Sequence, residues 1–220
     1  MYCCFLINSN IKQNLFKTEN FGFSMDKLRI LAAGDLHGSA DLAERLAKLA
    51  KKEKVDLVVL AGDIAGFGGE SEEVLKPFKR KRQKICFVPG NWDAFEDLEI
   101  FKNDAKSIHH YYVSYKGVGI LGVGNPDWKL SLDDSDFELI EKNFKRMKPR
   151  KRILVSHLHP KGTRAEFSGF EGDEILRKIT EKFQPDILIS GHIHEAEGIE
   201  DKIGKTRVIQ VGRKGKIIEV

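Results

Sequence analysis

The chain has 220 residues, of which 41% are hydrophobic and 32% are charged, which suits one α/β domain and excludes a disordered chain. No stretch offers the ~18 consecutive apolar residues of a transmembrane helix, so we expect no membrane partner. The net charge of +4 is only mildly basic, which leaves nucleic acid as a partner that is not favoured. Three cysteines, a low and odd number, fit a reducing compartment, and we expect a cytoplasmic protein.

Residues 1–24 differ from the rest of the chain. Their hydrophobic periodicity is weak, and their short apolar patch lacks the basic flank and cleavage site of a secretory signal. A clear strand pattern begins abruptly after Met25. We therefore predict that residues 1–24 are an N-terminal extension, disordered or dispensable, and that residues 25–220 form one domain. The sequence leaves the oligomeric state open.

Short apolar runs then alternate with amphipathic stretches. The pattern predicts a strand at 28–34, a helix at 41–52, a strand at 56–62, a helix at 71–82, a strand at 84–90 and a short helix near residue 97. A β-hairpin follows at 109–124 with its turn at Lys116-Gly117, then a helix at 134–147, a strand at 152–156, a helix at 173–183, a strand at 186–190 and antiparallel strands in 197–220. This alternation favours βαβ units and a largely parallel sheet, to which the middle and the tail add antiparallel pairing. The basic run 79–82 is expected to be the solvated end of a helix.

Polar side chains follow five of these strands, and in open α/β sheets the ligand crevice lies beyond the carboxyl ends of the strands. Each side chain alone has an ordinary explanation, such as a helix cap, a turn residue or a structural histidine. Their joint occurrence favours a shared site. The residues are Asp35 and His37, Asp63, Asn91 and Asp93, His157 and His159, and His192 and His194.

This set of nitrogen and oxygen donors contains no thiolate and exceeds what one tetrahedral zinc ion needs. It suits two divalent cations that share a bridging carboxylate, an arrangement typical of phosphoryl transfer. Imidazoles mixed with carboxylates favour manganese, iron or zinc over calcium or magnesium. The sequence therefore predicts two divalent metal ions as cofactors.

The segments D-L-H, G-D, G-N, S-H and G-H-I-H, in that order, resemble the motifs of the calcineurin-like metallophosphoesterases over residues 28–220. The resemblance implies an α/β fold, a β-sandwich of mixed sheets flanked by helices in four layers. It also implies hydrolysis of phosphate esters, with diesters favoured, by a hydroxide that bridges two metals, with Asn91 helping to offset phosphoryl charge. One metal would be held by Asp35, His37, His194 and the bridging Asp63, and the other by Asp63, Asn91, His157 and His192.

The third motif departs from the family, because G-N-W-D stands where G-N-H-[DE] is common. The family's histidine helps to protonate the leaving group, and the indole of Trp92 is no acid. His159 and Asp93 are the candidates to replace it, although His159 could instead orient a ligand and Asp93 could cap a helix.

Trp92 could stack on an aromatic or nucleobase leaving group, or simply form a wall of the pocket. The loop 125–128, with Asn125, is expected to line the pocket, and Arg164 to bind phosphate, unless both are merely solvated. The alternative to an enzyme is a metal-binding interaction scaffold with little turnover. A nuclease is less favoured, since no large capping structure is evident.

Overall fold

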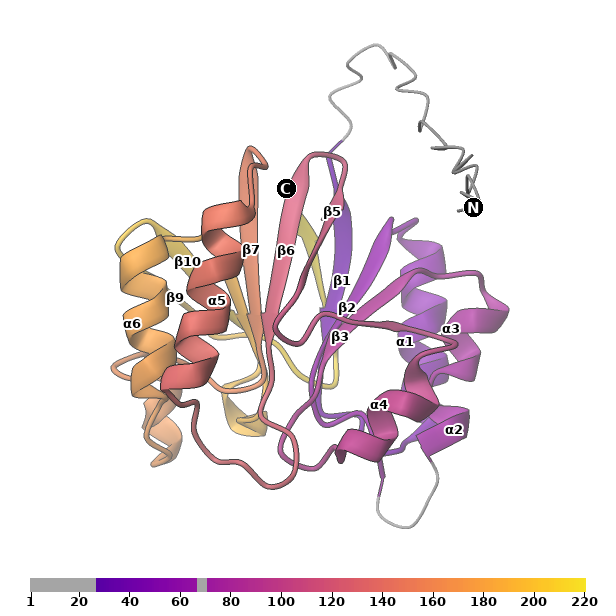
Figure 1. The fold of residues 1–220 in the computed structure, drawn as a ribbon. Helices are drawn as coiled ribbons and strands as arrows, with labels where there is room; N and C mark the ends of the chain where they lie inside the picture. Colours follow the sequence, from indigo (N-terminus) through magenta and orange to yellow (C-terminus); the bar gives the residue numbers. More distant parts are fainter. Residues whose placement is uncertain (1–26, 67–70) are drawn as a thin grey trace, which may run out of the picture.

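The computed structural model describes residues 27–66 and 71–220, which build two β-sheets packed face to face with helices on both outer faces (Figure 1). The sandwich of mixed sheets flanked by helices that the motifs imply is confirmed. The expected N-terminal extension, residues 1–24, lies outside the described residues. No helix in the described part of the chain is long and apolar enough to cross a membrane.

The first sheet has the strand order β11-β1-β2-β3-β4. Its strands are β1 (Arg29–Ala33), β2 (Leu57–Ala61), β3 (Ile85–Val88), β4 (Lys106–Ser107) and β11 (Lys216–Glu219). The first four run parallel, and β11 pairs antiparallel with β1. Every residue of β2 and β3 is buried, as expected for strands that are covered on both faces.

The second sheet has the order β5-β6-β7-β8-β10-β9. Its strands are β5 (Tyr112–Tyr115), β6 (Val118–Val123), β7 (Lys151–Ser156), β8 (Ile187–Ser190), β9 (Glu200–Ile203) and β10 (Thr206–Gln210). The four central strands are parallel, and β5 and β9 are antiparallel edges. The β5–β6 turn falls at Lys116 and Gly117, where φ is 46° and 76°, as the hairpin prediction requires.

Helices cover the two outer faces. Those on the first sheet are α1 (Ala40–Lys52), α2 (Ser71–Val74), α3 (Lys76–Arg80) and α4 (Phe95–Phe101), and those on the second are α5 (Asp134–Arg146) and α6 (Glu174–Phe183) (Figure 1). Side-chain caps define several starts: Ser39 accepts from the Leu42 amide at 3.3 Å, and Asp173 accepts from the Leu176 amide at 2.6 Å. Separate apolar clusters fill the two helix–sheet interfaces and the space between the sheets.

Several details differ from the sequence prediction. The helix predicted at 71–82 is two short helices, because Pro77 lies in the first turn of α3, where its missing N–H is tolerated, and would disrupt a helix interior. His109 and His110 precede β5 instead of belonging to it. The tail does not form one antiparallel unit, since β10 pairs parallel with β8 and β11 crosses to the first sheet.

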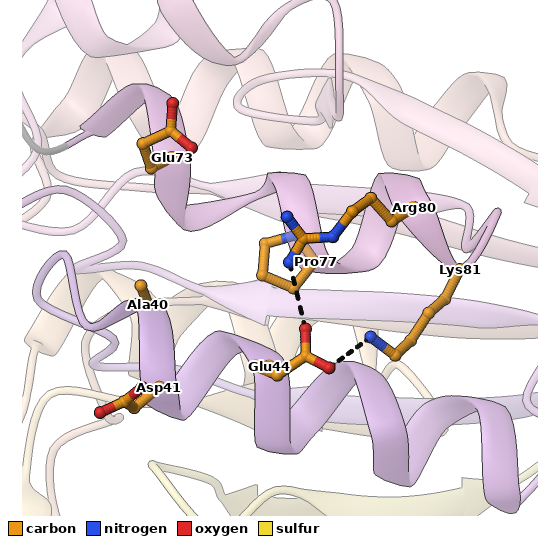
Figure 2. Close-up of a pocket in the computed structure, with 7 residues that line it drawn as sticks. All are labelled: Ala40, Asp41, Glu44, Glu73, Pro77, Arg80 and Lys81. Atoms are coloured by element: carbon orange, nitrogen blue, oxygen red, sulfur yellow. Dashed lines mark hydrogen bonds and ion pairs between the residues drawn. The ribbon is translucent and has the colours of Figure 1, made fainter.

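The basic run 79–82 ends α3, as predicted. Arg80 and Lys81 donate to the Glu44 carboxylate of α1 at 3.3 and 2.6 Å, so this part of the run neutralises an acid of the same chain (Figure 2). The two helices border a pocket of about 380 Å³, lined by groups of both charges that include Asp41 and Glu73. None of the predicted site residues lines it.

Two adjacent histidines connect the end of β6 to helix α5. The rings of His109 and His110 lie 3.7 Å apart, and the Gly124 amide donates to Nδ1 of His109 at 2.9 Å. Nε2 of His110 lies 2.7 Å from Oδ1 of Asp136 in α5. Burial, with a further contribution from His110, lowers the pKa of His109 to about 4. The fold therefore requires a neutral His109 that accepts from Gly124.

This requirement predicts acid sensitivity. The free energy of unfolding should fall as pH drops from 6.5 towards about 4, because the unfolded chain then binds a proton on His109 that the folded chain excludes. Below that range both states bind the proton and the loss stops. In His109→Asn an amide oxygen replaces the acceptor but cannot titrate, so its stability should fall less over this range. Denaturant unfolding across the range measures the difference, and parallel curves for the two proteins would contradict the prediction.

Candidate metal centre

Five strands of the sandwich end at one place. β1, β2 and β3 of the first sheet and β7 and β8 of the second point their carboxyl ends to the same end of the molecule (Figure 1). The structure thereby brings the predicted metal ligands together in two groups, each with ligand atoms within 4.8 Å of one another. The first group is Asp35, His37 and His194, and the second is Asp63, His157 and His192. Oδ1 of Asn91 lies 3.0 Å from Nε2 of His157, which adds Asn91 to the second group.

Asp63 lies between the groups. Its Oδ2 is 3.7 Å from Nε2 of His37 in the first group and 3.4 Å from Nε2 of His157 in the second. Its Oδ1 accepts the backbone N–H of Trp92 at 3.0 Å, which orients the carboxylate. One carboxylate oxygen therefore faces imidazoles of both groups, which is the geometry that a bridging ligand needs.

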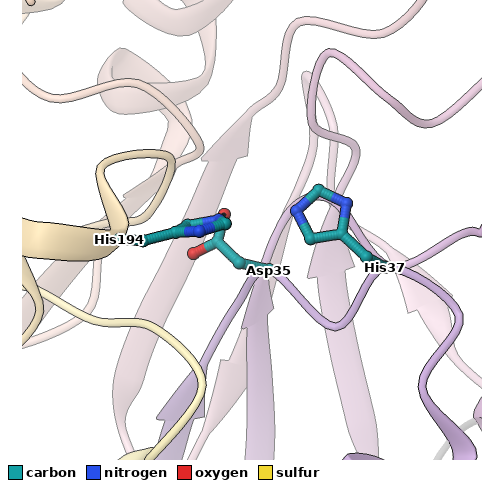
Figure 3. Close-up of side chains that lie close together, drawn as sticks. All are labelled: Asp35, His37 and His194. Carbon is teal, nitrogen blue, oxygen red and sulfur yellow. Dashed lines mark ion pairs between the residues drawn. The ribbon is translucent and has the colours of Figure 1, made fainter.

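The first group fits a cation. Asp35 lies between the imidazoles of His37 and His194 (Figure 3), and its Oδ1 is 3.6 Å from Nε2 of His194. Its Oδ2 is buried and has no hydrogen-bond partner among the described residues. A buried carboxylate oxygen without a donor is costly unless positive charge compensates it. Carboxylate and imidazole donors together suit a transition-metal ion at this point.

The backbone at the ligands is held in the left-handed region. φ is 57° at Asp35, 45° at His37, 51° at Asp63 and 73° at His192. Non-glycine residues adopt such angles rarely, and the cost is accepted mainly at functional sites. Backbone hydrogen bonds enforce the geometry, since the Asp35 amide donates to the carbonyl of Gly62 at 3.0 Å and the His37 amide to that of Asp63 at 2.9 Å.

His157 is oriented by the neighbouring sheet. Its Nδ1 lies 2.8 Å from the carbonyl oxygen of Ala61, which can only accept, so Nδ1 carries the proton and Nε2 faces the site. Nε2 lies 3.1 Å from Nδ1 of His192. This backbone partner has no signal in the sequence, because any residue at 61 supplies a carbonyl.

The electrostatics of the second group favour positive charge. Burial works to lower the pKa of His157, but the carboxylates of Asp63 and Asp35 outweigh it and raise that pKa to about 9. Burial, together with the neighbouring His157, lowers the pKa of His192 to about 4. The carboxylates that retain a proton on His157 would attract a divalent cation more strongly, and metal binding would displace that proton.

Two glycines allow the carboxylate and the imidazole to approach so closely. A Cβ on Gly90 would lie 2.1 Å from Oδ1 of Asp63, and one on Gly62, where φ is 88°, would lie 2.5 Å from Nδ1 of His157. The equivalent atom on Gly34 would meet nothing closer than 3.4 Å. The glycine before Asn91 is therefore required by packing, whereas the one before Asp35 is not.

The two predicted replacements for the missing acid are both buried. Asp93 is 1% exposed, and it accepts from the amides of Ile64 and Ala65 at 2.9 and 2.7 Å. Burial raises the pKa of Asp93 to about 7. It does not cap α4, whose N-cap is Ala94, so the capping role that we considered for it is wrong. His159 is 2% exposed. Neither side chain reaches solvent here, and a catalytic role for either stays a prediction.

The three residues predicted to contact substrate lie in three different environments. Trp92 is 42% exposed and meets the ring of His37 edge-on, with centroids 5.5 Å apart. Asn125 is buried, with Nδ2 donating to the Lys129 carbonyl at 2.5 Å. Arg164 is exposed at the start of the short 3₁₀ helix η1 (Arg164–Ser168). Of the three, only Trp92 is shown next to a candidate ligand.

Comparisons with known proteins identify a matching family model and related folds. A family model described as calcineurin-like phosphoesterase matches residues 28–196. The crystal structure of TT1561 from Thermus thermophilus is 16% identical, with a TM-score of 0.71 over 88% of this chain and 99% of that chain.

Two further structures share the fold. A dimetal phosphatase from Danio rerio is 13% identical, with a TM-score of 0.58 over 86% of this chain and 88% of that chain. GAP50, described as the anchor in the inner membrane complex of Plasmodium, is 16% identical, with a TM-score of 0.55 over 84% of this chain and 71% of that chain. No curated protein matches the chain by sequence.

The glycine contacts predict a selective loss of metal binding. Gly90→Ala should weaken Mn²⁺ binding strongly, because the new Cβ displaces the Asp63 carboxylate, whereas Gly34→Ala should bind nearly as the wild type does. Calorimetric titration of both variants with Mn²⁺ measures this, and circular dichroism checks that each is folded. Equal loss in the two variants, or none in Gly90→Ala, would contradict the packing argument.

Proposed function

The chain belongs to the calcineurin-like phosphoesterase family, and on that premise we propose that it hydrolyses phosphate esters, above all phosphodiesters, with two divalent cations. The observation that carries the proposal is the position of Asp63, whose one oxygen faces imidazoles of both ligand groups. A cation pair that shares a carboxylate clamps the attacking and leaving oxygens of a phosphoryl transfer. We place this activity in residues 25–220 and in the cytoplasm.

In this proposal the first group would hold one cation, the second group with Asn91 would hold the other, and Asp63 would contribute to both. Manganese, iron or zinc fits the donors. Two bound cations would lower the pKa of water held between them and neutralise charge on the phosphoryl oxygens. The chain's own residues set the geometry: Ala61 fixes the tautomer of His157, and Trp92 orients Asp63 through its backbone N–H. The side-chain amide N–H of Asn91 would donate to a phosphoryl oxygen.

The missing acid limits the substrate. Trp92 cannot protonate a leaving group, and Asp93 and His159 are buried. The proposed substrate is therefore a small ester whose leaving group needs little help from a proton donor, and Asp93 and His159 are the residues proposed to supply such help. The exposed guanidinium of Arg164 would attract its phosphate, and Trp92 and Asn125 would line the pocket.

A second candidate function is a metal-binding interaction scaffold. It is supported by the fold shared with GAP50, which is described as an anchor. The complete set of ligands in the present chain, and the strained backbone that positions them, favour turnover instead. Metal binding without hydrolysis under any divalent cation would favour the scaffold.

Removing the bridging charge tests the enzyme. Asp63→Asn should reduce turnover of bis-p-nitrophenyl phosphate with Mn²⁺ by more than about 100-fold. Mutation of a residue that only hydrogen-bonds to a metal ligand costs up to about 100-fold, and loss of a ligand should cost more. Calorimetry should find fewer Mn²⁺ ions per chain than in the wild type. Asp41→Asn, an exposed carboxylate outside both groups, serves as the matched control. Unchanged turnover in Asp63→Asn would contradict the dinuclear mechanism.

Restoring the family's acid tests the role of Trp92. Trp92→His should raise kcat by up to about 100-fold for aryl methyl phosphates with poor leaving groups. It should change kcat little for the p-nitrophenyl ester, because only poor leaving groups need a proton. The measurement is the slope of log kcat against leaving-group pKa, which should become shallower. Trp92→Phe controls for the loss of the indole. Parallel plots for the wild type and Trp92→His would show that position 92 does not reach the leaving group.

A further inference from the structure

The two tryptophans of the chain lie together at the edge of the metal centre. The rings of Trp92 and Trp128, the tryptophan pair, have centroids 5.0 Å apart, with an interplanar angle of 50°. Trp92 is 42% exposed and Trp128 is 58% exposed. Large aromatic surfaces are usually buried, so an exposed pair beside a site indicates a surface that contacts a ligand.

The loop that carries Trp128 is fastened to the strand end that carries Asn91. The Trp128 amide donates to the carbonyl of Asn91 at 2.9 Å, and the Asp127 amide donates to that of Asp93 at 3.0 Å. A third bond runs from the Asn125 amide to the carbonyl of Pro89 at 3.2 Å. The position of Trp128 is therefore set relative to the candidate ligands by backbone bonds.

This position requires an unfavourable backbone. φ is 58° at Asp127 and 60° at Trp128, so two successive non-glycine residues adopt the left-handed conformation. Glycine or asparagine is usual in such turns, and a bulky residue there is an outlier. The chain keeps a large indole where glycine would relax the turn, which points to a role for the ring itself.

We propose that the tryptophan pair is a stacking surface for the nucleobase of a nucleotide ester whose phosphate is bound at the metal centre. The proposal rests on the proposed phosphoesterase function. One imidazole, that of His37, separates the indole of Trp92 from Asp63, with centroids 5.5 Å apart and Nε2 3.7 Å from Oδ2. In a nucleotide one ribose separates phosphate from base, so a phosphate at the ligands would have its base within reach of the indoles. Aromatic side chains stack on any base.

The charge around the pair favours a nucleotide over a lipid surface. The exposed carboxylates of Glu96 and Asp127 are close to the pair in sequence, and Asp127 is adjacent to Trp128. Acidic groups at this rim would repel an anionic membrane, whereas a neutral base carries no charge for them to oppose. Because the two rings are tilted by 50°, a planar base would stack on one indole and contact the edge of the other.

The test compares two ligands that differ only in the base, AMP and ribose 5-phosphate, on the Mn²⁺-loaded full chain. All tryptophan emission comes from the pair, since the chain has no other tryptophan. AMP should quench this emission and bind about 10-fold or more tightly than ribose 5-phosphate, the preference that stacking on an aromatic side chain provides. Released phosphate is assayed in the same samples, so that binding is read before turnover.

Three variants test which side chains cause the preference for AMP over ribose 5-phosphate. Trp128→Ala should bring the affinity ratio of the two ligands close to one, whereas Trp92→Phe, which keeps an aromatic ring, should retain most of it. Phe167→Ala removes an aromatic side chain that is 64% exposed on η1 and should keep both the quenching and the ratio. A ratio close to one in the wild type, or an unchanged ratio in Trp128→Ala, would overturn the proposal.

Failure of this inference is distinct from failure of the proposed function. Hydrolysis of bis-p-nitrophenyl phosphate without any preference for AMP would overturn only the stacking surface. A preference for AMP that Trp128→Ala abolishes would support it even if no metal gave turnover. Binding to phosphatidylcholine vesicles that Trp128→Ala abolishes, without a preference for AMP, would assign the pair to a membrane and overturn the nucleotide.

Discussion

The burial of one carboxylate where the two sheets meet dictates which residues can surround it. Asp63 is 2% exposed, and burying a charge is expensive unless partners compensate it. Imidazoles from both sheets and one backbone amide supply that compensation. The neighbouring glycines follow from the same requirement, because any side chain at Gly62 or Gly90 would occupy the space that the partners need.

The site exists only when the sandwich is assembled. The first sheet contributes Asp35, His37, Asp63 and Asn91, and the second contributes His157, His192 and His194. The core between the sheets, built largely of valine and isoleucine, holds the two sets of strand ends at a set distance. Packing there is therefore coupled to metal affinity: a cavity that shifts one sheet would separate His157 from Asp63 without touching either residue.

The tryptophan at position 92 changes the balance between chemistry and recognition. A histidine there would serve the leaving group as an acid, whereas an indole provides surface. Trp128 places a second indole beside that of Trp92, and the turn that positions it contains two successive non-glycine residues in the left-handed conformation. Both features act in the same direction, since each adds surface for binding where the family commonly has a proton donor.

Features that depend on local pattern were predictable from the amino-acid order. Apolar runs that end in a polar residue located the five strands at the site and every candidate ligand, and Lys116-Gly117 located a hairpin turn, because these signals act within a few residues. Pro77 is a local signal of the same kind. The prediction of one helix at 71–82 did not take it into account, whereas the structure has two helices, α2 and α3.

The pairing of distant strands and the contacts between distant atoms became clear only from the folded chain. The crossing of β11 to the first sheet, the contact of His157 with the Ala61 carbonyl and the contact of Trp128 with Trp92 all join segments far apart in the chain. No local pattern encodes such contacts, because they depend on how two sheets pack together and on backbone groups that every residue carries alike.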